Sequence, residues 1–138
     1  MEERTLVIIK PDGVERNLTG HLLKEFERND LRISHLKTMQ PEMALVRKHY
    51  AELADKPFFN DLLTYFTRGP VVVFLVDGRN AVKRVRELVG VTDPKAARLN
   101  TLRSLYGIDK SENTIHASDS FESAEREIKL WFKELFNN

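Results

Sequence analysis

The side chain best suited to chemistry near neutral pH in this sequence is His116, within the segment Asn113–Ser120. Imidazole has an ordinary pKa of about 6.5, so it can serve as a nucleophile or a base without strong perturbation. The segment is typical of a short strand that runs into a helix start, because Ser118 and Asp119 are common at the first residues of helices. Such a junction places a side chain at a domain surface, where free backbone N–H groups point outward.

A carboxylate that holds one imidazole nitrogen leaves the other nitrogen free to attack, so the last predicted helix matters for His116. At about 100° per residue, Glu127 lies about 40° beyond Trp131, at the edge of the apolar face of that helix. Glu125 lies at the opposite edge of the same face. Helical periodicity therefore leaves Glu127 and Glu125 as alternative partners for the histidine.

The glycine-rich phosphate-binding loops of the two common nucleotide-binding patterns do not occur in this sequence. A bound phosphate would have to be held by side chains, and the candidates are Lys10, Arg86 and Arg103. Lys10 ends a predicted buried strand and is followed by a rigid proline, whereas arginine suits bidentate phosphate contacts. Taken singly, each of the three is better explained as an ordinary charge on a solvated surface.

The other histidines are His21, His35 and His49, and no two of the four are spaced as a helical pair of metal ligands. We therefore expect no zinc site. Two aromatic residues, Tyr50 and Phe58, flank a predicted corner between helices. Aromatic residues near such corners usually fill the core, as we expect for Phe59 and Phe66, but one at an exposed turn can provide a stacking surface for a base.

The composition bounds the remaining possibilities. With 138 residues, 41% hydrophobic and 31% charged, the chain is expected to form one globular domain, residues 1–138. A net charge of +1 gives no support for nucleic-acid binding, and the absence of cysteine excludes disulfides and thiolate chemistry. The sequence contains no apolar run long enough for a signal or membrane helix, so we expect a cytoplasmic protein without a membrane partner.

Apolar periodicity and turn residues predict an α/β (α+β) protein of βαββαβ type with extra helices. We expect a four-stranded antiparallel sheet with helices packed on one face. The predicted strands are residues 5–9, 31–39, 71–76 and a short strand before His116. The predicted helices are about residues 19–28, 42–50, 57–68, 78–89, 99–106 and 121–135, and Thr92-Asp93-Pro94 can start a further one.

Several motifs, in the correct order over nearly the whole chain, resemble those of a nucleoside diphosphate kinase. They are Lys10-Pro11-Asp12-Gly13-Val14, His49-Tyr50, Lys56-Pro57-Phe58-Phe59, Arg68-Gly69-Pro70, Arg86 with Gly90, Thr92 and Pro94, Thr101-Leu102-Arg103, and Asn113 with His116, Ser118, Asp119 and Ser120. Each motif alone is weak. Together they identify a resemblance that composition and periodicity could not provide.

The resemblance implies a ferredoxin-like fold and a ping-pong reaction. A nucleoside triphosphate would give its γ-phosphate to His116, and the phosphohistidine would give it to a different nucleoside diphosphate. Lys10, Arg86 and Arg103, with Mg²⁺ bridging the terminal phosphates, would neutralise the charge on the moving group. Mg²⁺ would be held mainly by the nucleotide rather than by protein ligands.

The resemblance also assigns expected roles to the remaining site residues. Thr92 and Asn113 would donate hydrogen bonds to a phosphate and to the sugar hydroxyl, and Tyr50 would form a hydrogen bond near the histidine. Phe58 would stack on the base, which suits broad base specificity because every base has a face to stack. Glu127, helped by Ser118, would orient His116.

Two residues depart from the family pattern: Ala117 replaces the usual glycine after the histidine, and Asn100 stands where a glycine normally precedes Thr101. The segment that follows Asn100 helps to form the subunit interface in relatives, and it differs here. We expect a homo-oligomer, with a hexamer or a tetramer ahead of a dimer.

Two rival classes are a non-catalytic module that binds RNA or regulates a partner, and a silent relative that acts as a scaffold. An RNA-binding sheet needs exposed aromatic residues on its central strands, and residues 71–76 offer one phenylalanine among aliphatics. The presence of every motif residue disfavours the scaffold. If a neutral imidazole is the nucleophile, phosphorylation is expected to slow as the pH drops below the pKa of the histidine.

Overall fold

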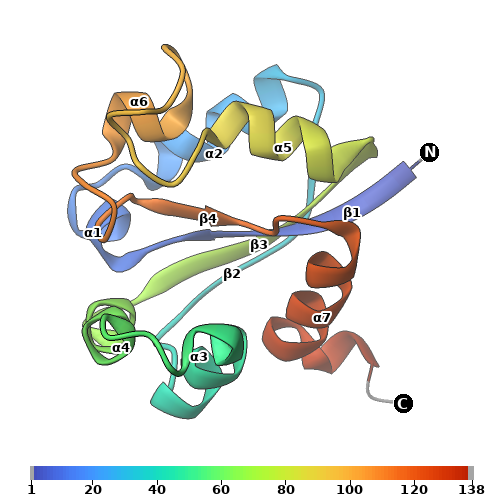
Figure 1. Cartoon of the computed structure of the whole chain (residues 1–138). Coiled ribbons are helices and arrows are strands. Elements are labelled where there is room, and N and C mark those ends of the chain that lie inside the picture. The colour runs from blue at the N-terminus through green and yellow to red at the C-terminus, as the bar shows by residue number, and fades with distance from the viewer. Residues whose placement is uncertain (1, 137–138) are drawn as a thin grey trace.

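The computed structural model describes residues 2–136, so Met1, Asn137 and Asn138 of the expected domain lie outside the described residues. Its centre is a four-stranded antiparallel sheet in the order β2-β3-β1-β4 (Figure 1). The strands are β1 (Glu2–Ile9), β2 (Arg32–Met39), β3 (Val71–Arg79) and β4 (Ile115–Ala117). This order and pairing confirm the predicted fold class.

The two central strands bury both of their faces, which explains their continuous apolar sequences. Leu6 and Ile8 of β1 belong to one core cluster, whereas Val7 and Ile9 belong to a second cluster on the opposite face of the sheet. The aromatic pair of Phe26 and Phe74, with ring centroids 5.2 Å apart, fills the second cluster. Both faces of the sheet therefore need a covering layer.

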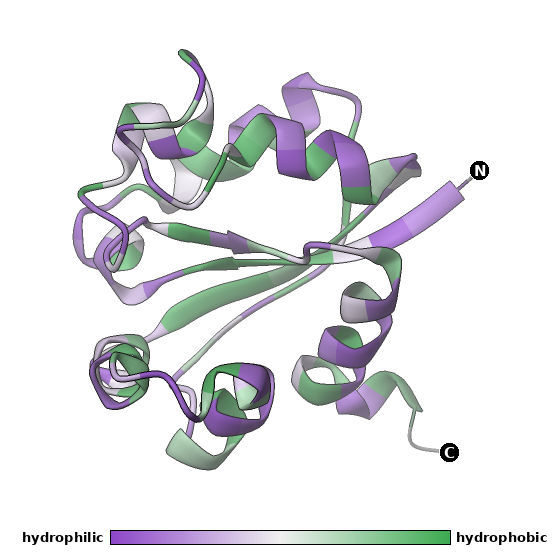
Figure 2. Ribbon diagram, viewed as in Figure 1, coloured by the Kyte–Doolittle hydropathy of each residue, from purple (hydrophilic) through white to green (hydrophobic). Residues whose placement is uncertain are grey.

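Helices supply a layer on each face (Figure 1). One face is covered by α2 (Thr19–Arg28), α5 (Ala81–Val89) and α6 (Leu102–Tyr106), and the other by α3 (Met43–His49), α4 (Phe59–Thr67) and α7 (Phe121–Trp131). The expectation of helices on one face was incomplete, because the additional helices enclose the second face. In Figure 2 the middle of the sheet is mostly green, or apolar, whereas each helix has both green and purple, polar stretches. Among residues 2–136, no helix is both long and apolar enough to cross a membrane.

Several boundaries differ from the predictions for local reasons. A short helix, α1 (Pro11–Glu15), occupies the predicted turn, with proline in its first turn. β3 continues to Arg79 beyond the predicted end at residue 76, because Asp77 and Gly78 pair with β1. Residues 92–95 form turns instead of a helix. The last helix ends at Trp131 and is followed by the 3-10 turn η2 (Lys133–Phe136), and a second such turn, η1 (Ala51–Leu53), links α3 to α4.

Candidate active site

A cavity of about 580 Å³ opens at the end of β1, between the α3–α4 corner and α7. Nine of the ten predicted site residues line it, namely Lys10, Tyr50, Phe58, Arg86, Thr92, Arg103, Asn113, His116 and Glu127. The tenth, Ser118, is fully buried and contacts the cavity residue Glu127. Residues that are up to 117 positions apart in the chain, from Lys10 to Glu127, thus meet at one site.

Strand register places the histidine in this cavity. His116 pairs with Ile8 of β1 in the antiparallel ladder, so its side chain lies on the face covered by α3, α4 and α7. Lys10 follows Ile8 by two residues, and it reaches the same cavity where β1 ends. The alternation of the strand therefore brings the nucleophile candidate and the first cation to one side of the sheet.

The carboxylate that orients the histidine is Glu127. Its Oε1 lies 2.7 Å from Nε2 of His116, and the Ser118 hydroxyl donates to the same oxygen over 2.8 Å. Glu127 is 5% exposed, whereas Glu125, the alternative that periodicity left open, is exposed to solvent. The second of these carboxylates has no part in the site.

The environment keeps the His116 ring neutral. Burial, and then the positive charges of Lys10, Arg103 and Arg86, hold the pKa of His116 well below its ordinary value. Burial raises the pKa of the Glu127 carboxyl, although the Ser118 hydrogen bond opposes this. In the neutral ring Nε2 carries the proton and donates to Glu127, so Nδ1 keeps a free lone pair.

Two of the three predicted cations, Lys10 and Arg103, are buried near the histidine, and Arg86 is partly buried. Lys10 is 5% exposed and donates from Nζ to Oδ1 of Asn113 over 2.8 Å. Burial, and then the charge of Arg103, lowers the pKa of Lys10 to about 7. The guanidinium of Arg103 donates to the carbonyls of Gly90 and Ile115, each over 2.8 Å. Burial, and then Arg86, lowers the pKa of Arg103 to about 10, which reflects positive charges crowded without a neighbouring anion.

Arg103 also carries a buried donor, Nε, that has no hydrogen-bond partner among residues 2–136. Buried polar groups are nearly always paired, so this unpaired donor is an exception, and it belongs to a side chain that lines the cavity. One carbonyl that Arg103 holds belongs to Gly90, which has a φ of 93°. A Cβ at this position would lie 2.7 Å from Thr101 Oγ1, so both the conformation and the space require glycine. This glycine lets α5 and α6 approach closely enough to aim the guanidinium at the cavity.

The remaining predicted residues complete the walls. Asn113 donates from Nδ2 to the carbonyl of Thr92 over 3.1 Å, which joins two of the predicted contacts. Tyr50 follows α3, and its ring centroid lies 6.4 Å from that of His116. Phe58 precedes α4 and is 51% exposed, as expected for an aromatic residue available for stacking. The neighbours expected to fill the core, Phe59 and Phe66, are buried.

The sequence did not single out His49 as a functional residue. Its ring packs against His116 with centroids 4.5 Å apart, and its Nδ1 accepts a hydrogen bond from Nε1 of Trp131 over 2.9 Å. One ring nitrogen or carboxylate oxygen from each of His49, His116 and Glu127 lies within 4.8 Å of the others. Because Nδ1 is an acceptor, Nε2 of neutral His49 carries a proton and has no lone pair for a metal. The position of His49 next to Tyr50 was the one feature of the sequence that could have indicated its place in the site.

The departures from the family pattern are accommodated locally. Asn100 has a φ of 71°, in the left-handed region that asparagine tolerates better than most residues, so it can replace a glycine there. Ala117 is 2% exposed and pairs with Val7 in the sheet. Its small side chain packs into the core cluster on the face opposite to His116.

A neutral, carboxylate-held histidine with an open nitrogen, facing cations on a ferredoxin-like sheet, is the arrangement that a histidine-dependent phosphotransferase needs. The family model for "Nucleoside diphosphate kinase" matches residues 3–135. The chain belongs to the nucleoside diphosphate kinase family, and the predicted family and enzyme class are confirmed.

Individual relatives agree over almost the whole length. The nucleoside diphosphate kinase of Saccharopolyspora erythraea is 51% identical, with 98% of this chain and 100% of the relative covered. That of Methanosphaera stadtmanae is 48% identical over 97% of this chain and 88% of the relative. The crystal structure of the Aquifex aeolicus nucleoside diphosphate kinase superposes with a TM-score of 0.94 at 40% identity, covering 98% of both chains.

Proposed function

We propose that this nucleoside diphosphate kinase transfers the γ-phosphate of a nucleoside triphosphate to His116 and then to a second nucleoside diphosphate. In the first half-reaction the bond from the γ-phosphorus to the β-γ bridging oxygen breaks, and a bond from Nδ1 to phosphorus forms. The nucleoside diphosphate leaves with the electron pair of the broken bond. The reverse sequence with another diphosphate makes CTP, GTP or UTP. The observation that carries this proposal is the hydrogen bond between Nε2 of His116 and Glu127, which leaves the other ring nitrogen, Nδ1, free to react.

The charges around the ring suit each stage of the transfer. Phosphorylation of Nδ1 while Nε2 keeps its proton puts positive charge on the ring, which the Glu127 carboxylate balances. Lys10, Arg86 and Arg103 face the developing negative charge on the transferred group and on the leaving phosphate. Because these groups are held before substrate arrives, little reorganisation is needed during the reaction.

A histidine suits the energetics of this exchange. The reaction replaces one phosphoanhydride by an equivalent one, so an intermediate of similar energy serves best. A phosphoramidate on imidazole meets this need better than a phosphate ester on serine. The covalent intermediate also allows one binding site to accept the donor and the acceptor in turn.

The nucleotide contacts follow from the cavity walls. We assign the phosphates to Lys10, Arg86, Arg103 and Thr92, and the sugar hydroxyl to Asn113, with Tyr50 forming a hydrogen bond near His116. Phe58 stacks on the base. Stacking tolerates every base, which supports broad base specificity.

Mg²⁺ enters as part of the substrate, bound to the terminal phosphates. The charges that act most strongly on His116 are the cations Lys10, Arg103 and Arg86, and the Glu127 carboxylate already accepts two hydrogen bonds. This donor set fits an ion whose ligands come from the nucleotide, since Mg²⁺ prefers several oxygen ligands. Its chemical contribution is to neutralise the terminal phosphate charge.

We also propose a single domain over residues 1–138, located in the cytoplasm, and a homo-oligomer that is a hexamer or a tetramer. Exposed apolar side chains support the assembly: Leu99 is 89% exposed, Leu105 57% and Ile108 50%. Leu105 lies in the segment that differs from the family pattern, and Leu99 and Ile108 flank it. Apolar side chains gathered in this way favour burial against another copy of the chain.

Incubation with ATP labelled at the γ-phosphate tests the phosphohistidine. We expect a label on the protein that is stable in alkali, labile in acid, and released by any added nucleoside diphosphate. His116→Ala should abolish the label, and His21→Ala, a change on the exposed side of α2, should retain it. A label that survives His116→Ala would overturn the proposal.

A further inference from the structure

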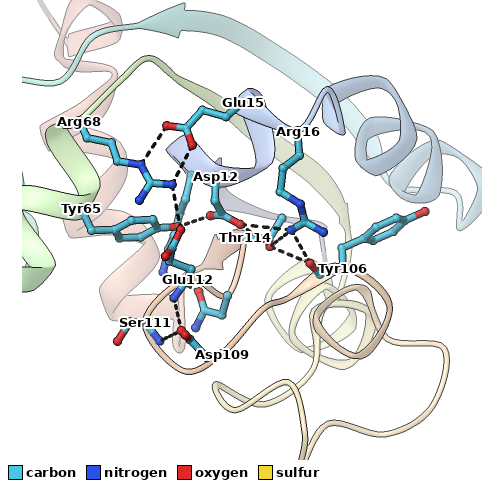
Figure 3. A network of polar contacts seen from close by, with 12 residues as sticks. Asp12, Glu15, Arg16, Tyr65, Arg68, Tyr106, Asp109, Ser111, Glu112 and Thr114 are labelled. Carbon is cyan, nitrogen blue, oxygen red and sulfur yellow. Dashed lines mark hydrogen bonds and ion pairs between the residues drawn. The ribbon is translucent and has the colours of Figure 1, made fainter.

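Asp12 is a buried carboxylate outside the cavity wall, and it has no part in the phosphoryl transfer proposed above. It is 1% exposed and accepts hydrogen bonds from the hydroxyl groups of Tyr65 and Thr114, the latter over 2.7 Å. Arg16 lies 3.5 Å from its second oxygen. Figure 3 shows these three side chains converging on the Asp12 carboxylate from α4, from the segment before β4, and from the end of α1. Three separate parts of the fold are thus joined at one charge.

Two of the joined parts carry the residues assigned to the nucleotide. Lys10 precedes α1 and lies two residues before Asp12, and Asn113 immediately precedes Thr114. The backbone N–H of Lys10 donates to the carbonyl of Thr114 over 2.9 Å, in addition to the bond from its Nζ to Asn113. The Asp12–Thr114 bond therefore closes a ring that contains both nucleotide-binding side chains.

The packing at this corner leaves little freedom. A Cβ added at Gly13 would lie 2.8 Å from Cγ2 of Ile9 and 3.1 Å from Cγ2 of Thr114, so the two segments are in direct contact there. Tyr65 adds the third segment, because it lies on α4, the helix that begins after Phe58, and it also lines the cavity. Burial, and then the hydrogen bond to Asp12, raises the pKa of Tyr65, so its hydroxyl remains a donor.

We propose that Asp12 is a positioning residue for the phosphate end of the cavity. Through Thr114 and Tyr65 it holds Lys10 and Asn113 in the arrangement that receives the nucleotide, and its charge favours the protonated Lys10 ammonium against the nearby charge of Arg103. This inference rests on the proposed function, because it assigns Asp12 to the binding of the same phosphates.

The electrostatic part follows from the groups that face Lys10. The charge of Arg103 lowers the pKa of Lys10, in addition to burial, and the charge of Asp12 raises it. The buried histidines are neutral, so they add no further positive charge beside Lys10. The titratable groups at this end of the cavity come from several elements. They are Asp12 of α1, Arg16 directly after α1, Arg103 of α6, His116 of β4, His49 of α3, and Glu127 of α7, which is hydrogen-bonded to His116.

The outer part of the same network consists of ion pairs that are exposed to solvent. Arg68, after α4, bridges Glu15 over 2.7 Å and Glu112 over 2.8 Å, and all three side chains are about a third exposed or more (Figure 3). Exposed ion pairs usually contribute little, because solvent and salt screen them. The buried bonds of Asp12 are therefore the ones expected to control the geometry of the site.

The test is equilibrium binding of ADP, measured between about pH 6.5 and 9 for the full chain and its variants, a range around the lowered pKa of Lys10. Asp12→Asn removes the charge but preserves the shape. Thr114→Val and Tyr65→Phe each remove one hydroxyl and leave the charge, and valine keeps the β-branched shape that Thr114 shows at its φ of 79°. Asp77→Asn is the matched control, because Asp77 also accepts from an arginine and a hydroxyl, Arg4 and Ser34, far from the cavity.

We expect Thr114→Val and Tyr65→Phe to weaken ADP binding about fivefold without moving the pH at which binding begins to decline. Asp12→Asn should weaken binding at least as much and move that pH down by about one unit, because the Lys10 ammonium loses its compensating negative charge. Asp77→Asn should leave both quantities unchanged, even if it lowers the free energy of unfolding.

Normal ADP binding by Asp12→Asn at every pH, with or without a loss of stability, would overturn the inference. If Asp12→Asn does not fold, the two hydroxyl variants decide, and unchanged binding by both would overturn it. Failure of the unmodified protein to bind ADP at all would instead overturn the proposed function, and the inference with it.

Discussion

The two ends of the cavity differ in how firmly they are built. At the phosphate end, the side chains of Lys10, Arg103 and Glu127 are buried and each forms a short hydrogen bond to a protein group. At the base end, residues 51–58 link α3 to α4, and nearly all of them are exposed. Phe58, which we assign to the base, is itself half exposed.

This difference matches what the proposed transfer requires of each end. Charge develops at the phosphate end, where groups fixed in advance stabilise a transition state most effectively. The base end contacts a part of the substrate that does not react and that varies between nucleotides. A single exposed aromatic face accepts all bases, whereas fixed hydrogen-bond partners would select among them. Rigid chemistry and tolerant recognition are therefore separated within one cavity.

The largest effect is expected when the phosphate end is altered. Glu127→Gln should reduce the rate of His116 phosphorylation about a hundredfold, because the uncharged amide cannot balance the positive charge on the phosphorylated ring. The rate can be measured in a single turnover with labelled ATP.

The matched control is Glu125→Gln, which changes an exposed carboxylate of the same helix two residues away. It should phosphorylate at the unmodified rate. Equal losses in the two variants would mean that the effect arises from helix charge rather than from the contact with His116.

A smaller effect is expected at the base end. Phe58→Ala should raise the Michaelis constant about tenfold for every nucleoside diphosphate alike, because the stacking surface is lost. The maximal rate should change little, since Phe58 does not contact the reacting groups. Steady-state assays with several different bases measure both quantities.

Phe121→Ala is a suitable control, because Phe121 is a similarly exposed aromatic residue, 47% against 51%, and does not line the 580 Å³ cavity. It should leave the Michaelis constants unchanged. If Phe58→Ala raised the Michaelis constant for one base only, this would contradict the inference that the base end accepts all bases alike.

Much of this contrast was predictable from local sequence. Strand alternation and helical periodicity predict the sheet and most helices, because burial on a defined face controls both. Exposed Phe58 and the buried phenylalanines beside it were separated correctly, since turn residues precede the helix. Periodicity could not choose between Glu127 and Glu125, because that choice depends on where His116 lies across the sheet.

The parts that the sequence did not predict depend on contacts between distant segments. The second layer of helices, the hydrogen bond from Trp131 to His49, and the bonds of Asp12 to Tyr65 and Thr114 all join residues far apart in the chain. The local pattern around Asp12 indicates only a turn, because it carries no information on such partners. The family motifs named the site residues but gave no reason for their burial.

The smallest expected effect concerns pH, and it moves the expected slowing of phosphorylation to a lower pH range. At saturating ATP, the single-turnover rate should fall by less than about twofold between about pH 8 and 6, because burial and nearby cations hold the pKa of His116 well below its ordinary value. A histidine with an ordinary pKa of about 6.5 would be about three-quarters protonated at about pH 6, and the rate would fall to about a quarter. The folded protein loses the neutral ring only below its lowered pKa, so the rate should decline there and not earlier. A fall of the rate to about a quarter under these conditions would show that the phosphate end is more open to water than the burial of Lys10 and His116 implies. The two ends of the cavity would then differ less than we infer.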